Sequence, residues 1–445
     1  MASDLLSIAY SGTRAARSSL EVTAQNIANA DTDGYVRRSA NIREVAASPG
    51  FPYQDRLTLA GSRVAGVERN IDPLLAAEAR RSSSEFEGAK TLLSGLKAIE
   101  GAIEAADPFG AIVGFEESLQ ALQADPVNTA LRIAVIGKAE TVANAFRHVS
   151  GELGAQSVAA AERISYAVDE VNQFAGSLAK LNEKIARAGL ESSGRAHLLD
   201  QRDLLLSQLN ERADIAVSFE SNGTVKVQIG DDRSSALVSG TRVGTFTWAA
   251  DASGVATFQV NGANTNLRSG AIDGLRQTQL EIGDAFVRLD QQADNLRQLV
   301  NASQSAGSDL SGAPGSPLFG GSTAGTMSVV ITGADKLATA PAGASPMSRD
   351  TSNLDNLRAS LSQKGIAQAS NQHLFDVSTK VVKQDVTVQA VGAVSNAARA
   401  ALQLQAGVDL EQEAANLVRF QQAFEASARA MQTATEIFDT LLGIG

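Results

Sequence analysis

The chain has 445 residues, more than one ordinary hydrophobic core accommodates, so we expect two or three domains. Its formal net charge of −11 argues against nucleic-acid binding, which needs a basic surface to displace counterions from phosphates. The absence of cysteine excludes disulfides, thiolate metal sites and cysteine nucleophiles. Aromatic residues make up only 4% of the chain, which favours aliphatic, alanine-rich cores between packed helices.

The amino-terminal segment 1–30 carries an apolar stripe at helical spacing. The helix is expected to end near Asn29, because residues 31–34 have turn chemistry and Gly34 can adopt a positive φ. The segment lacks the charged and apolar regions of a signal peptide, and no stretch of about 18 apolar residues predicts membrane insertion. The stripe alternates steps of three and four residues, as a heptad seam does, through Leu6, Ala9, Thr13, Ala16, Leu20, Thr23, Ile27 and Ala30.

The middle of the chain is predicted to be mainly helical. An extended segment that follows the first helix is interrupted by Pro49, Pro52 and Gly61. Residues 129–188 contain no proline, which predicts long helices or one rod broken around Gly151–Gly154. The helices expected from apolar spacing are 73–103, one before Pro126, 129–188, 195–212, 271–303, 353–364 and 373–405. Asp107-Pro108 is expected to close the first of these.

At about Asp214 the hydrophobic period changes from helical to alternating, which predicts strands. A bulged loop of three residues at 222–224 would pair Phe219 with Val227 and Val217 with Ile229. A loop is expected at 303–325 and a short strand at 327–332. A second hairpin is expected between 243–249 and 255–260, with Phe246 and Trp248 on one strand and Phe258 and Val260 on the other.

The carboxyl-terminal segment 411–442 carries a second heptad seam. Asp409 is placed to cap this helix, and Gln412 to complete a capping box. The small residues Ser427 and Ala434 occupy two seam positions. The large seam residues are Leu417, Phe420, Phe424, Met431, Phe438 and Leu441.

These patterns predict a mainly α chain with a small inserted all-β domain and an elongated, multi-domain form. The N- and C-terminal helices are expected to pair in a coiled-coil-like inner domain, in which the large seam residues meet Leu6, Leu20 and Ile27 within one subunit and in its neighbours. The domains expected are 1–45 with 408–445, a helical rod of 46–212 with 270–407, and the β domain at 213–269.

The sequence predicts no enzyme, no cofactor and no metal site. The histidines His148, His197 and His373 are scattered, without the spacing of metal ligands. Residues 199–203 include Asp200, Arg202 and Asp203, but such charges far more commonly lie on the surface of a helix than in an acid–base site.

Four stretches of the chain resemble a known family. Asn26-Ile27-Ala28-Asn29-Ala30, followed by Thr32, Gly34-Tyr35 and Arg37, resembles the amino-terminal signature of bacterial flagellar axial proteins. The stretch 198–203, the loop 309–319 and the segment 407–424 are similar to the hook-associated branch of that family. Asp33, Asp409 and Gln412 differ from the residues usual there but keep turn or capping chemistry.

The resemblance implies a structural subunit that polymerises through its terminal helices into a ring between hook and filament. The implied partners are other copies of the chain, the hook protein, a second hook-associated junction protein and a cytoplasmic export chaperone around Leu417–Leu441. The implied location is extracellular, on the flagellum, after export without a cleaved signal. Two alternatives stay open: another axial protein, either hook or second junction protein, and a secreted coiled-coil binding protein.

The termini are also expected to be disordered in the monomer. Isolated helices are marginal in water, because fixing the backbone costs more than a narrow apolar stripe returns. We therefore expect both ends to fold when they meet each other and neighbouring subunits.

Overall fold

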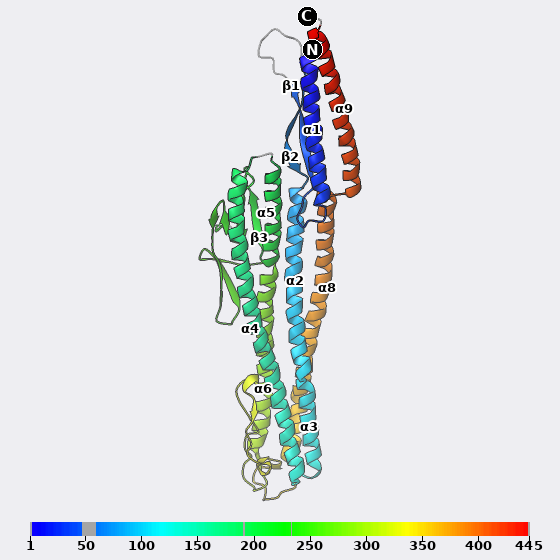
Figure 1. Ribbon diagram of the computed structural model, residues 1–445. Coiled ribbons are helices and arrows are strands. Elements are labelled where there is room, and N and C mark those ends of the chain that lie inside the picture. The colour runs from blue at the N-terminus through cyan, green and yellow to red at the C-terminus, as the bar shows by residue number, and fades with distance from the viewer. Residues whose placement is uncertain (1, 47–58, 190–191, 233, 444–445) are drawn as a thin grey trace.

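The computed structural model describes residues 2–46, 59–189, 192–232 and 234–443. The molecule is long and narrow, and both termini lie at the same end (Figure 1). The fold class expected from the sequence is confirmed, because long helices dominate and the sheets are small. The helices are α1 (Ala2–Ala28), α2 (Pro73–Ala106), α3 (Pro108–Ala124), α4 (Thr129–Arg187), α5 (Ser193–Arg212), α6 (Ala271–Ala306), α7 (Ser352–Lys364), α8 (Ile366–Ala406) and α9 (Leu410–Gly443).

The helices pair along the length of the molecule. At the end that holds the termini, α1 lies beside α9, and further along α2 lies beside α8 (Figure 1). At the opposite end α3, α4, α6 and α7 enclose an aliphatic core in which Phe115, Phe146 and Leu153 are fully buried. Phe115 meets Phe319 edge to face, with ring centroids 5.9 Å apart.

Asp107 explains the sharp boundary between α2 and α3. Its backbone is left-handed with φ of 42°, and its side chain accepts the N–H of Gly110 at 2.9 Å. Pro108 follows as the first residue of α3, where its missing N–H costs nothing. The expected stop at Asp107-Pro108 is confirmed.

The long helix α4 is continuous, so the expected break around Gly151–Gly154 is wrong. A Cβ added at either glycine would meet no atom within 4 Å, so both glycines lie on an open face. The neighbouring residues Val149 and Leu153 are fully buried on the opposite face. Tertiary packing therefore holds the helix together where two glycines weaken its propensity.

The strands at 215–265 form two small antiparallel sheets against α4, α5 and α6. Their apolar side chains share one core with these helices, and Phe246 stacks on Phe258 at 5.7 Å within it. The first sheet has the order β3 (Ile215–Phe219), β4 (Val225–Ile229), β5 (Val238–Ser239) and β6 (Arg242–Val243). The second has the order β7 (Phe246–Ala250), β8 (Ala256–Val260) and β9 (Ala263–Thr265).

The register of the first hairpin differs from the expected one. Phe219 pairs with Val225 and Val217 with Val227, two residues away from the predicted partners. The loop spans 220–224 and is closed by a bond from Glu220 N to Thr224 O, with Gly223 at φ of +83°. A shift of two residues keeps each side chain on its expected face. The second hairpin is confirmed, with Phe246 opposite Val260 and Trp248 opposite Phe258.

A hairpin that the sequence did not predict follows α1. The strands β1 (Arg38–Ala46) and β2 (Leu59–Arg69) are antiparallel and lie against α1. Pro49 and Pro52 fall outside the described residues. Gly61 packs closely on α1, because a Cβ there would lie 3.2 Å from the Cα of Ile8.

A long irregular segment connects α6 to α7. It holds the short strands β10 (Gly307–Ser308), β11 (Phe319–Gly320), β12 (Ser328–Val329) and β13 (Ala340–Pro341). The expected strand at 327–332 is thus confined to two residues. The fully buried Arg132 fastens the segment by donating to Leu337 O at 2.7 Å and to Thr339 Oγ1 at 2.8 Å. Burial lowers the pKa of this guanidinium to about 10.

Candidate functional site

The helices α1 and α9 form an antiparallel pair that we call the terminal helix pair (Figure 1). Small side chains make its closest contact. On α1 the residues Ala9, Ala16 and Thr23 are buried, and on α9 Ala434 is buried. A Cβ added to Gly12 would lie 2.9 Å from Ser427 Oγ. The two backbones therefore approach closely where small residues face each other.

The large residues expected in the seam lie beside this contact rather than at its centre. In the single chain Leu6 is 37% exposed and Phe438 is 42% exposed. Helices brought together by glycine, serine and alanine leave no room for leucine or phenylalanine between them. The expected packing of these large residues within one subunit and against neighbours stays a prediction. The side chain of Leu441 lies outside the described residues. The partly buried members are Leu20, Ile27, Leu417, Phe420, Phe424 and Met431.

Two shallow grooves follow the terminal helix pair. Leu6, Tyr10 and Met431 line one of them. The other is lined by residues of α1, α9 and β2, among them Ile8 and Ile437. Tyr10 and Ile8 are 56% and 38% exposed, so a single chain leaves much of this apolar surface open to other molecules.

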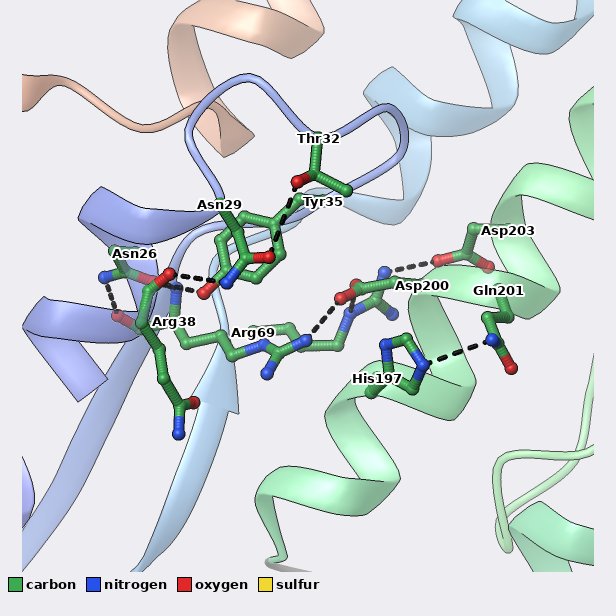
Figure 2. A network of polar contacts seen from close by, with 11 residues as sticks. Asn26, Asn29, Thr32, Tyr35, Arg38, Arg69, His197, Asp200, Gln201 and Asp203 are labelled. Atoms are coloured by element: carbon green, nitrogen blue, oxygen red, sulfur yellow. Dashed lines mark hydrogen bonds and ion pairs between the residues drawn. The ribbon is translucent and has the colours of Figure 1, made fainter. Parts of the chain in front are cut away.

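The other end of the terminal helix pair is anchored by buried and partly buried polar side chains that we call the polar joint: Asn26, Tyr35, Arg37, Arg38, Arg69, Asp200, Asp203 and Glu413. Figure 2 shows six of them, drawn from α1, the turn that follows it, β1, β2 and α5. They join the chain's first helix, its last helix and the rod at one point.

Asn26 lies at the centre of the polar joint and is fully buried. Its Oδ1 accepts the N–H of Arg38 at 3.0 Å and the hydroxyl of Tyr35 at 2.8 Å. Its Nδ2 donates to Arg38 O at 2.8 Å and to Glu413 Oε2 at 3.1 Å. One amide therefore holds the turn after α1 and touches α9.

Glu413 connects α9 to this point. It is 1% exposed, and its Oε1 accepts from Arg37 Nε at 2.7 Å. The backbone N–H of Arg37 in turn donates to Ala406 O at 2.8 Å, at the end of α8. A buried carboxylate with these donors is satisfied, whereas an unpaired one would be strongly unfavourable.

Asp200 and Asp203 of α5 complete the polar joint. Asp200 accepts from Arg38 Nη2 at 2.7 Å and from Arg69 Nε at 2.8 Å. Asp203 accepts from Arg69 Nη2 at 2.6 Å and from Arg202 Nη2 at 2.7 Å. Burial raises the pKa of the Asp200 carboxyl, although Arg69 and Arg38 act in the opposite direction. Burial likewise raises the pKa of the Tyr35 hydroxyl.

The expectation that the charges at 199–203 lie on a helix surface is wrong. Asp200 and Arg202 are each 6% exposed. Besides its bond to Asp203, Arg202 donates to Gly223 O at 2.8 Å, and burial lowers the pKa of its guanidinium. The helical spacing alone gave no signal for this burial, because the arginines that cover α5 come from distant strands.

The remaining signature residues shape the turn between α1 and β1. Asn29 Nδ2 donates to Gln25 O at 2.9 Å, and Thr32 Oγ1 donates to Asn29 Oδ1 at 3.4 Å (Figure 2). Gly34 has φ of +75°, as its sequence context predicts. Its position next to Leu204 brings the turn against α5.

Asp409 caps α9 as expected, because its Oδ1 accepts the N–H groups of Glu411 at 2.9 Å and Gln412 at 3.2 Å. Among the described residues, Gln412 returns no side-chain hydrogen bond to Asp409. The reciprocal half of the predicted capping box is therefore not formed.

The side chains of the polar joint attach segments of the chain to one another. The polar atoms named above are engaged with other protein groups, whereas Arg38 Nε is buried without a hydrogen-bond partner. Across the part of the chain that the structure describes, no cluster of three or more potential metal-binding side chains is found. Within the same residues, no helix combines the length and hydropathy needed to cross a membrane.

Comparisons with known proteins match three parts of the chain separately. Residues 109–319 match the model of the "flagellar hook-associated protein FlgK helical domain". Residues 6–35 match that of a flagella basal body rod protein, and residues 404–444 match the C-terminal model of flagellar basal body rod FlgEFG proteins.

Relatives named flagellar hook-associated protein 1 are similar to the chain. The protein of Bacillus subtilis is 27% identical, over 97% of this chain and 96% of its own length. The Escherichia coli protein is 27% identical, over 71% of this chain and 60% of its own length. The Salmonella typhimurium protein is 29% identical, over 52% of this chain and 42% of its own length. The chain thus spans about half the length of the enterobacterial relatives.

A solved structure supports the fold. The flagellar hook junction protein of Burkholderia pseudomallei is 23% identical with a TM-score of 0.50, covering 54% of this chain and 46% of that one.

Proposed function

We propose that this chain belongs to the family of flagellar hook-associated protein 1 and is a structural subunit that forms the junction ring between the flagellar hook and filament. It would polymerise through the terminal helix pair, whose grooves would receive neighbouring subunits. The observation that carries the proposal is that the two ends, matched separately by models of flagellar rod proteins, meet in one pair in the structure.

The middle of the chain distinguishes this role from that of another axial protein. Rod-protein models match only the ends, whereas the helical domain of the hook-associated family matches 109–319. That region is built of α3, α4, α5 and α6 with two small sheets. The polar joint fastens the two ends of the chain to this region through α5. The placement of the terminal helix pair of a subunit would therefore determine the placement of its rod.

The division into domains is part of the proposal. We assign 1–45 with 408–445 to an inner, tube-lining domain, since the polar joint lies where these segments meet the rod. The rod comprises 46–212 with 270–407. The strands at 213–269 share a core with α4, α5 and α6, which supports their folding together with the rod.

The partners we propose are other copies of the chain, the hook protein and a second hook-associated junction protein. A cytoplasmic export chaperone would hold α9 before export through the flagellar channel, without cleavage of a signal. Much of α9 is exposed along its length, and Glu413 and Ala434 are its buried residues among those described. So little burial supports the proposal that both ends are unfolded before assembly.

Deletion of the gene in its own bacterium tests the function. We expect hooks without filaments and flagellin monomers released into the medium, because no platform for the filament forms. Supplying the full chain should restore filaments, whereas a chain that ends at residue 409 should not. Normal filaments in the deletion strain would contradict the proposal and favour a secreted binding protein instead.

A further inference from the structure

The heptad pattern of the terminal helix pair leaves its register undetermined. On α1 the small residues Ala9, Ala16 and Thr23 recur every seven residues. On α9 Ser427 and Ala434 are also seven residues apart. A slip of one heptad, about 10 Å along the axis, would bring equivalent faces together again. Apolar and small residues alone therefore permit several pairings.

Glu413 breaks this repetition. It lies four residues before Leu417 and so occupies a seam position, the only seam position of α9 after residue 411 that holds a charge. It is also the most buried residue of α9 among those described, at 1% exposure. A single buried polar residue in a heptad seam is a known means of selecting one register.

The partners of Glu413 are held in place by groups other than Glu413. Asn26 is oriented by its bonds to Arg38 and Tyr35, which aim its Nδ2 at the carboxylate. Arg37 follows the same turn and donates to the other carboxylate oxygen. The acceptor site for α9 is thus built by the amino-terminal segment.

We propose that Glu413 is a positioning residue that sets the register in which α9 packs on α1. The contact of Gly12 with Ser427 belongs to the same register, since Gly12 lies 14 residues before Asn26 and Ser427 lies 14 residues after Glu413. A slip by one heptad separates Glu413 from both donors and leaves its charge without a partner. Only one of the equivalent apolar pairings therefore satisfies the carboxylate.

Disulfide trapping in the full-length chain tests this inference, because the chain has no cysteine of its own. A triple variant carries Gly12→Cys, Ser427→Cys and Ala434→Cys. A Cβ on Gly12 lies 3.5 Å from Ser427 Cβ, which suits a disulfide in the native register. A pairing of 12 with 434 reports a slip of one heptad. Oxidation in a glutathione buffer at high dilution captures the helix pair each time that it forms transiently in a single chain, so the two ends need not be folded at equilibrium. Peptide mass spectrometry then gives the ratio of the two disulfides.

With Glu413 present, we expect the 12–427 disulfide to exceed the 12–434 disulfide by at least about tenfold. Glu413→Ala should lower that ratio toward one, and Glu413→Gln, which can still accept hydrogen bonds, should give an intermediate ratio. Glu411→Ala is the matched control, because Glu411 carries the same charge in the same helical turn but is exposed. It should leave the ratio unchanged.

An unchanged ratio in Glu413→Ala would overturn the inference, even if the total yield of disulfide falls, because that result describes a residue that only strengthens the pair. A fall of the disulfide ratio in Glu411→Ala as large as that in Glu413→Ala would also overturn the inference. The ratio is measured within one chain and without hook or filament, so it is independent of the outcome of the gene deletion.

Discussion

The terminal helix pair and the far end of the rod are both built from helices, but they are stabilised in different ways. In the rod, Phe115, Phe146 and Leu153 are fully buried in a core to which α2, α3, α4, α6, α7 and α8 contribute. In the terminal helix pair the contact is narrow, its centre is made of small residues, and Leu6 and Phe438 stay exposed. The comparison shows that a heptad pattern marks a surface able to pack, while the number of surrounding elements decides how much of it is buried.

The same contrast holds for buried charge. The rod end uses Arg132 to bind backbone oxygens of its long connecting segment. The polar joint instead uses the amide of Asn26 on α1 together with carboxylate and guanidinium groups from β1, β2, α5 and α9. Directional bonds replace apolar area where little apolar area is available, and they specify one arrangement of segments that lie far apart in sequence.

Hydrogen exchange in a dilute monomer gives the largest expected contrast. Amides of α4 between 142 and 178 should exchange only by global unfolding, whereas those of α9 between 417 and 440 should exchange at least about a thousandfold faster. The physical reason is that, among the described residues, α1 is the one helix that makes extensive contact with α9. Equal and strong protection of both helices would remove the proposed difference between the two regions.

A cavity in the rod core should lower the free energy of unfolding far more than a cavity in the terminal helix pair. Phe146→Ala is expected to reduce the free energy of unfolding by about 3–5 kcal/mol, since a fully buried aromatic ring is lost. Phe438→Ala should cost under about 1 kcal/mol, because its ring is 42% exposed. Urea denaturation followed by circular dichroism measures both. Phe375→Ala, at an exposed position of α8, is the control and should be nearly neutral.

The polar joint can be weakened at Asp200. Asp200→Asn should destabilise the region around α5 by about 3 kcal/mol, because Arg38 and Arg69 would be left buried with one less carboxylate. Fluorescence of Trp248, the single tryptophan, follows unfolding of the core that α5 shares. Asp33→Asn, at an exposed turn position, should have no measurable effect. A large effect of the control would assign the loss to net charge rather than to the joint.

The stability of the rod should depend on pH through His373. Burial holds the pKa of this imidazole at about 4, and Nε2 has no hydrogen-bond partner. In the unfolded chain the imidazole takes up a proton below about pH 6.5, while the folded chain resists protonation until about pH 4. Stability is therefore full above pH 6.5 and falls as the pH drops toward 4, by up to about 3 kcal/mol.

His373→Gln should flatten this pH profile of unfolding, measured by urea titration at several pH values. His148→Gln, at an exposed position on α4, should leave the profile unchanged. A profile that His373→Gln does not alter would place the dependence on other groups, such as Asp376 and Arg288 beside it.

The smallest expected effect is at the start of α9. Asp409→Ala removes the cap and should destabilise that helix by about 1 kcal/mol. The change should appear as faster hydrogen exchange at 413–416 in assembled subunits. Gln412→Ala is the comparison variant and should change exchange less, because its side chain does not complete a capping box.

The sequence determined the elements of this protein well, because each depends on local chemistry. Helix ends were readable from Asp107-Pro108, from Gly34 and from Asp409, and in the two predicted hairpins the face of each strand was readable from alternation. The expected break in α4 failed because Val149 and Leu153 are held by the core on the face opposite the glycines. The hairpin register failed because a loop of five residues keeps the same alternation as the expected one.

Only the tertiary structure decided how the polar joint and the terminal helix pair are built. Asp200 and Arg202 have the spacing of surface charges, and their burial depends on arginines more than 100 residues away in the chain. In the sequence, Glu413 resembles an ordinary acidic residue in the first turn of a helix. Its role follows from its contacts with Asn26 and Arg37 at the other end of the sequence. Local periodicity records which face of a helix can be buried, but partners that are distant in sequence determine which residues on that face are buried and which register is chosen.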